Sequence, residues 1–177
     1  FTFQRLLRFA LPTVVMMIFT TIYGVVDGLF VSNFVGKTSF AAVNFIMPLL
    51  MILGCVGFMF GSGGGALIAK TLGENDQEKA NELFSMVVYV AGVCGIVLAA
   101  IGFVSVRPIA VLMGATGELL ENSVLYGRII LLALPFFILQ YEFQCLFATA
   151  GKPNLGLIIT VTAGLTNVVL DALFVAV

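Results

Sequence analysis

Five long runs of apolar residues dominate the sequence. The runs cover residues 9–35, 40–69, 83–106, 124–150 and 155–177. Each can cross a hydrocarbon core of roughly 30 Å, because an α-helix rises about 1.5 Å per residue. Strands of a membrane β-barrel are about half as long and alternate apolar with polar residues, which these runs do not. We therefore predict an all-α fold, a polytopic transmembrane helix bundle with five visible spans.

The composition supports a membrane protein and excludes other classes. Hydrophobic residues make up 61% of the chain and charged residues 10%, which leaves too little polar surface to cover a water-soluble globule. The net charge of −1 offers no basic face to nucleic acid. The first run is too long for a cleaved signal peptide, so we expect it to remain in the protein. Because the chain starts at Phe1 and stops on an apolar run, we expect it to be a fragment.

Lysine and arginine residues are unevenly divided between the two sides of the predicted membrane. One side carries Arg5, Arg8, Lys70, Lys79 and Lys152. The other side carries Lys37, Arg107 and Arg128. Since cytoplasmic segments are enriched in lysine and arginine, we predict a cytoplasmic N-terminus and a multi-pass protein of the inner (plasma) membrane.

Three short polar segments connect the later runs. In the first, Asn75 with Glu78 three residues on has the spacing of a capping box that opens a helix. Residues 107–123 are too polar and too broken by glycine and proline to span, so we predict a short interfacial helix there. In the third connection, Gly151 is expected to stop one helix and Pro153 to start the next.

The sequence lacks the residues that most enzymes and metal sites need. It contains no histidine, the commonest zinc ligand and general base. Cys55, Cys94 and Cys145 lie in different runs and are interpreted as packing residues. Gly61 and Gly65 form a GxxxG pattern, which favours close packing of two helices. We therefore predict that the chain is not an enzyme and holds no cofactor and no metal.

Two aspartates lie inside apolar runs. A carboxylate at bilayer depth costs about 2.5 to 3.5 kcal/mol, so Asp27 and Asp171 must face protein or water. If their helices start near Phe9 and Pro153, each aspartate lies 18 residues in, roughly 27 Å along the axis. Both helices run outward, because both are odd-numbered in the chain. We predict that the two carboxyl groups sit at similar depth.

Polar residues extend from each aspartate along one face of its helix. Asn167 precedes Asp171 by four residues and therefore shares its face, with Thr160 further back. Two such stripes would face each other across a cavity and could bind protons or a sodium ion. The residues of the first helix in this pattern are Thr13, Thr20, Tyr23 and Asp27.

Glu142 is a third acid inside an apolar run, flanked by polar residues. It lies about two helical turns before a predicted cytoplasmic turn. We predict that its side chain snorkels toward water or bonds to a neighbouring helix, with a role in transport as the alternative.

Four segments of the chain resemble the multidrug and toxic compound extrusion (MATE) transporters, in particular bacterial multidrug exporters. They are "ALPTVVMMIFTTIYGVVDGLFV" (10–31), "GSGGGALIAKTLGENDQEKA" (61–80), "GKPNLGL" (151–157) and "TNVVLDALFV" (166–175). The resemblance implies twelve helices in two six-helix lobes. Residues 1–177 would then be a partial N-terminal lobe that lacks the sixth helix and the second lobe.

The resemblance also implies a coupling site. In the family, an aspartate of the first helix and an Asn-x-x-x-Asp of the fifth form a cation or proton site. By motif match these residues are Asp27, Asn167 and Asp171. Whether the coupling ion is a proton or sodium stays open.

These observations favour a secondary antiporter that exports organic cations or drugs in exchange for protons or sodium. The 17 Phe, 4 Tyr and 7 Met suit a cavity for lipophilic cations, to which Thr20, Tyr23 and Thr160 are assigned. One alternative is a lipid-linked precursor flippase of the same superfamily, which should line its cavity with arginine. Another is a non-transporting helix scaffold or channel module, which would not explain two depth-matched acids.

Overall fold

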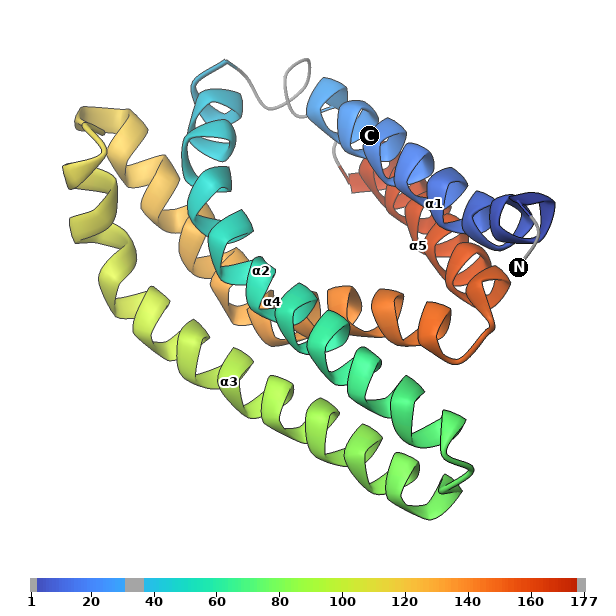
Figure 1. The fold of residues 1–177 in the computed structure, drawn as a ribbon. Helices are drawn as coiled ribbons and strands as arrows, with labels where there is room; N and C mark the ends of the chain where they lie inside the picture. Colours follow the sequence, from blue (N-terminus) through green and yellow to red (C-terminus); the bar gives the residue numbers. More distant parts are fainter. Residues whose placement is uncertain (1–2, 31–36, 175–177) are drawn as a thin grey trace. The chain divides into compact units, whose positions relative to one another are not determined.

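The computed structural model describes residues 3–30 and 37–174, and each of the five predicted runs corresponds to one helix over its described residues (Figure 1). The described residues contain no strand, so the predicted all-α class is confirmed. The helices are α1 (Phe3–Phe30), α2 (Lys37–Gly73), α3 (Gln77–Leu112), α4 (Gly117–Thr149) and α5 (Pro153–Phe174).

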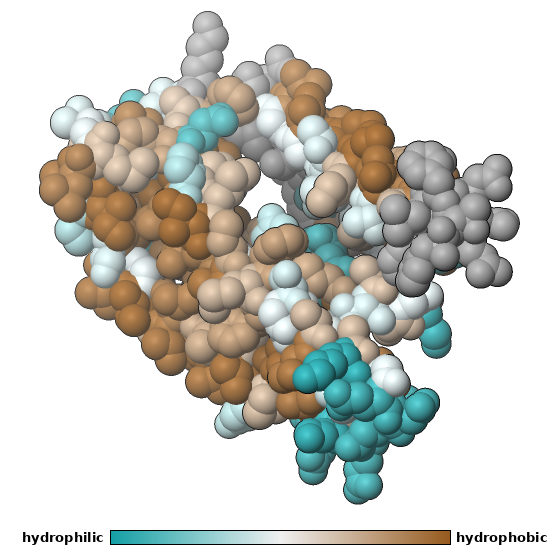
Figure 2. All heavy atoms as spheres, viewed as in Figure 1, coloured by the Kyte–Doolittle hydropathy of each residue, from teal (hydrophilic) through white to brown (hydrophobic). Residues whose placement is uncertain are grey.

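Most of these helices have the length and composition of membrane spans. Within the described residues, 4 helices are long and apolar enough to cross a bilayer. They are Thr38–Gly73, Gln77–Leu112, Gly117–Thr149 and Pro153–Leu170, and α1 adds the shorter apolar stretch Ala10–Val26. Figure 2 shows hydrophilic side chains gathered at the α2–α3 turn, where Lys70 and Glu74 form an exposed ion pair of 3.9 Å. Apolar surface between polar ends is what a multi-pass membrane protein requires.

Two of the three connections differ from the predictions. Asp76, not Asn75, caps α3: its carboxylate accepts a hydrogen bond of 3.1 Å from the Lys79 N–H. Asn75 adopts a left-handed φ of 61° one residue earlier and therefore cannot be the cap. The turn before α5 is confirmed, with Gly151 at a φ of 69° and Pro153 as the first helical residue.

The predicted interfacial helix at 107–123 is wrong. Residues 107–112 continue α3 and residues 117–123 begin α4, with positive φ at Gly114 in the turn and at Gly117, the first residue of α4. The Arg107 guanidinium and the Glu121 carboxylate lie 3.0 Å apart and join the two helix ends. The polar residues of this segment therefore belong to the ends of two long helices rather than to a separate element.

The chain divides into two compact units. Residues 1–40 and 150–177 form one unit, here called the α1–α5 pair, and residues 41–149 form the other, here called the three-helix unit. In the three-helix unit, α3 and α4 run side by side in opposite directions (Figure 1). Its core is built from buried side chains of α2, α3 and α4, among them Ile46, Val106, Leu131 and Ile138.

Glycines let α2 approach α4 closely. A Cβ at Gly61 would lie 2.8 Å from the Cα and the carbonyl oxygen of Glu142, and one at Gly65 would lie 2.7 Å from Oγ1 of Thr149. The predicted GxxxG packing face is confirmed. Gly57 extends it by one turn, because a Cβ there would meet the Ile138 backbone. We call Gly57, Gly61 and Gly65, together with the α4 residues they touch, the glycine seam.

Candidate functional site

The α1–α5 pair carries all the residues predicted to bind the ion or the substrate. The two helices lie side by side and run in the same direction (Figure 1). They pack tightly at Gly164, where a Cβ would lie 2.8 Å from Cδ1 of Tyr23. The absence of a side chain at Gly164 therefore makes room for the Tyr23 ring.

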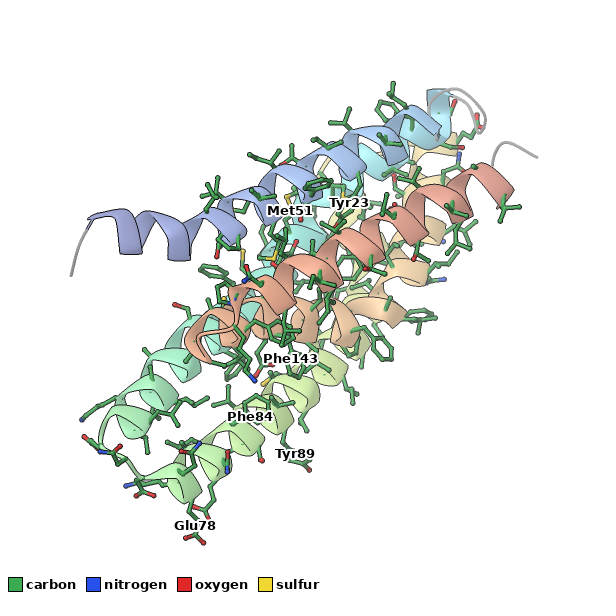
Figure 3. All side chains as sticks on the ribbon, turned by 90° about the vertical axis from the view of Figure 1, so that its right-hand side faces the viewer. Tyr23, Met51, Glu78, Phe84, Tyr89 and Phe143 are labelled. Carbon is green, nitrogen blue, oxygen red and sulfur yellow. The ribbon has the colours of Figure 1, made fainter. Side chains whose placement is uncertain are left out.

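A small cavity of about 110 Å³ lies between the two helices. Tyr23, drawn in Figure 3, and Thr160, which is 6% exposed, place two hydroxyl-bearing side chains in its otherwise apolar wall. The structure thus brings these two predicted residues together. The full lining is Phe19, Ile22, Tyr23, Val26, Thr160, Val161, Gly164, Leu165 and Val168.

Thr20 is not among the residues that line this cavity. Its hydroxyl donates a hydrogen bond of 2.9 Å to the Met16 carbonyl oxygen, one turn earlier in α1. A threonine commonly satisfies its hydroxyl on its own helix in this way. The structure therefore separates Thr20 from Tyr23 and Thr160, with which the sequence pattern had grouped it.

Asn167 holds a buried polar atom that has no described partner. Its side-chain oxygen Oδ1 is buried, and no hydrogen bond to it is found among the described residues. The side chain borders a second hollow of about 540 Å³ along α5, which Thr162, Thr166 and Leu170 also line. Buried amide oxygens nearly always accept a hydrogen bond or a ligand, so this atom is a candidate acceptor.

Asp27 and Asp171 lie in α1 and α5, but their side chains fall outside the described part of the structure. The backbone gives their register. Asp27 comes four residues after Tyr23, and Asp171 comes seven residues after Gly164, which Tyr23 contacts. In parallel helices this difference of three residues is about 4.5 Å along the axis. Because α1 begins at Phe3, counting from the predicted helix start does not give the depth, whereas the register places the two aspartates within about one turn.

The prediction that Glu142 snorkels toward water is wrong. The residue is 0% exposed and lies on the buried side of α4, and neither carboxyl oxygen has a hydrogen-bond partner among the described residues. Counting turns from the helix end did not reveal this, because the face on which a residue lies decides its exposure. The buried residues Ile138 and Leu146, four positions before and after it, show that face and could have been noticed in the sequence.

Comparison with known families identifies a match over most of the chain. The family model described as MatE matches residues 12–173. The chain is 28% identical over 173 residues to the multidrug export protein MepA of Staphylococcus haemolyticus (strain JCSC1435), a match that covers 98% of this chain and 38% of that protein. It is 25% identical to MepA of Staphylococcus aureus (strain MRSA252), with the same coverage. The chain therefore spans about 38% of the length of the curated relatives it matches.

Solved structures share the fold. An outward-facing multidrug resistance MATE family transporter of the MOP superfamily superposes with a TM-score of 0.88 and 25% identity, over 95% of this chain and 37% of that one. A MOP superfamily transporter from Pyrococcus furiosus, described as having a binding pocket of reverse polarity, gives a TM-score of 0.87 at 25% identity, with the same coverage.

Proposed function

The chain belongs to the MatE family, and from this premise we propose that it forms most of the first lobe of a secondary antiporter. The antiporter exports organic cations or drugs across the plasma membrane in exchange for protons or sodium ions. Two findings support the export of drugs: relatives named as multidrug export proteins, and the fold shared with a multidrug resistance transporter. The cytoplasmic N-terminus and the absence of a resident cofactor belong to the same proposal.

The observation that carries the proposal is the buried Asn167 oxygen one turn before Asp171. An amide oxygen and two carboxylates, from Asp27 and Asp171, would form a set of oxygen ligands for a proton or for a sodium ion. Carboxylate and carbonyl oxygens are the ligands that hard cations prefer. Ion binding at the α1–α5 pair would drive transport by favouring one state of the protein over the other.

Tyr23 and Thr160 are proposed to contribute to the substrate path. The cavity they line, about 110 Å³, is smaller than the roughly 300 to 1,000 Å³ typical of drug sites. The α1–α5 pair would therefore supply only part of the substrate surface. The aromatic ring of Tyr23 could bind a cationic substrate through a cation–π interaction, which contributes about 0.5 to 2 kcal/mol.

Single substitutions of the acids test this function. We expect Asp27→Asn and Asp171→Asn in the full-length protein each to reduce ethidium efflux from energised cells by about tenfold or more, since coupling free energies of 1 to 3 kcal/mol correspond to about 5- to 150-fold. Glu78→Gln is the matched control, because Glu78 is an exposed carboxylate at the start of α3 and points away from it (Figure 3). Unchanged efflux in both aspartate variants at normal expression would reject the coupling roles.

The same efflux assay identifies the ion. Collapse of the proton gradient abolishes efflux if protons couple transport, whereas removal of sodium abolishes it if sodium does.

The two other functions receive less support. An arginine-lined flippase cavity needs arginine inside the lobe, but Arg128 is exposed and stacks on Phe103 at 5.1 Å from the ring centroid. A non-transporting scaffold or channel module would give no gradient-dependent efflux at all.

A further inference from the structure

The three-helix unit contains a buried acid that the proposed function does not use. Glu142 of α4 is 0% exposed, and both of its carboxyl oxygens lack a hydrogen-bond partner among the described residues. Leu134, Ile138 and Leu146 occupy the same face of α4 at spacings of four residues, and all are buried. Glu142 therefore occupies a buried position on a helix face whose other members are leucine and isoleucine.

The glycine seam closes over this acid from α2. A Cβ at Gly61 would lie 2.8 Å from Cα of Glu142 and 2.9 Å from Cβ of Cys145, so the α2 backbone lies directly against α4 here. One turn to either side, a Cβ at Gly57 would meet the Ile138 backbone, and a Cβ at Gly65 would meet the Thr149 side chain, so α2 stays close to α4 over this stretch. The two helix backbones meet at Glu142, and the residue is 0% exposed.

Helix α3 contributes apolar side chains beside Glu142, and its described stretch at this level contains no basic residue. Phe143, next to Glu142, meets Phe84 of α3 edge to face with ring centroids 6.2 Å apart (Figure 3). The described stretches that pack at this level are 57–65 of α2 and 84–91 of α3, and neither contains a lysine, arginine or acid. The titratable groups around Glu142 are Tyr141 and Cys145 on α4 and, on α3, Tyr89, which is 73% exposed.

These surroundings accommodate an uncharged carboxyl group and not a carboxylate. A buried ion without a partner is strongly disfavoured, and the usual remedy is to bind a proton. When α2 and α4 separate and water enters, a carboxylate becomes tolerable and the proton can leave to water. The state of the seam and the protonation of Glu142 are therefore linked.

We propose that Glu142 is a second proton-binding site, carried by the glycine seam of the three-helix unit. It takes up a proton from water before the seam closes, holds it while the seam is closed, and returns it to water when the seam opens. The site is separate from the α1–α5 pair and does not depend on the coupling roles proposed there. It makes the packing of α2 on α4 sensitive to pH.

Infrared difference spectroscopy on the full-length protein in lipid nanodiscs tests the proposal. Spectra recorded at acidic and alkaline pH should show a C=O stretching band of a protonated carboxylic acid that disappears on ionisation. We expect Glu142→Gln and Glu142→Met to lose this band, and Asp27→Asn and Glu78→Gln to keep it. Asp27 and Asp171 can contribute carboxylic-acid bands of their own, so the test is the part of the signal that the Glu142 substitutions remove. If the pH-dependent C=O signal is the same in the wild type and in both Glu142 variants, or if the wild type shows no such signal, the proposal is overturned.

Thermal unfolding gives a second readout that needs no transport. Glu142→Gln retains the shape of a protonated glutamate but cannot ionise. The difference in melting temperature between Glu142→Gln and the wild type should therefore grow as pH is raised, in favour of the variant. A difference that stays constant with pH would show that Glu142 does not exchange protons and would overturn the proposal. Because ethidium efflux is not measured here, failure of this proposal is distinguishable from failure of the coupling roles of Asp27 and Asp171.

Discussion

The α1–α5 pair and the three-helix unit each bury a polar group without a described partner, but they surround it in different ways. At Gly164 in the pair, the nearest group is the ring of Tyr23, a side chain that can rotate, and a cavity of about 110 Å³ lies beside it. At Gly61 in the three-helix unit, the nearest atoms are the backbone of Glu142. The first arrangement can adapt to a ligand, whereas the second can change only if two helices separate.

The largest effect is expected at Gly61. We expect Gly61→Ala to destabilise the protein by about 1 to 3 kcal/mol, because its Cβ would lie 2.8 Å from backbone atoms that cannot turn aside. Gly63→Ala is the matched control on the same helix, since a Cβ at Gly63 meets nothing within 4 Å. Removing that glycine should be neutral or stabilise by roughly 0.4 to 1 kcal/mol. The melting temperatures of the two variants in detergent measure these changes in stability. Equal shifts for Gly61→Ala and Gly63→Ala would show that close backbone packing at Gly61 does not make the three-helix unit more sensitive to substitution than the α1–α5 pair.

A smaller effect is expected for the same substitution in the α1–α5 pair. In Gly164→Ala the new Cβ would press on Cδ1 of Tyr23, and the ring can move into the neighbouring cavity. We expect a loss of less than about 1 kcal/mol, at the low end of overpacking costs. The double variant Gly164→Ala with Tyr23→Leu should recover most of that loss, because contacting residues are energetically coupled. A cost as large as that of Gly61→Ala would show that the pair is as rigid as the seam.

The architecture could be predicted from the sequence because a bilayer allows few solutions. Apolar runs of sufficient length must be helical in lipid, and Gly151 with Pro153 marks a helix boundary through backbone conformation alone. The cap of α3 was missed by one residue, because Asn75 and Asp76 are both capable side chains and only local geometry separates them. The polarity of residues 107–123 indicates that this segment leaves the membrane, but it does not show where the backbone hydrogen bonds of α3 end and those of α4 begin.

The candidate site was less predictable, because it depends on which helix faces meet. The pattern grouped Thr20 with Tyr23, yet only the packing of α5 on α1 shows that Tyr23 lines a shared cavity. Glu142 was assigned by its distance from a helix end, whereas its burial follows from the partner that Gly61 brings against it. The spacing of Ile138, Glu142 and Leu146 indicates a shared face of α4, but the residues that pack on this face are far away in the chain and have no local signal.

The smallest effect is expected at Thr20, and it sharpens the contrast within the α1–α5 pair itself. Thr20→Val and Thr160→Val make the same change, replacing a hydroxyl with a methyl group of similar size. The Thr20 hydroxyl is already used by the Met16 carbonyl at 2.9 Å, so its loss should change stability by no more than about 0.5 kcal/mol and ethidium efflux by no more than about twofold. Thr160 lies 6% exposed in the wall of the cavity beside Tyr23, so its loss should reduce efflux more. If the two variants transport equally well, the cavity between α1 and α5 does not contact the substrate, and the contribution of the pair is confined to Asp27, Asn167 and Asp171.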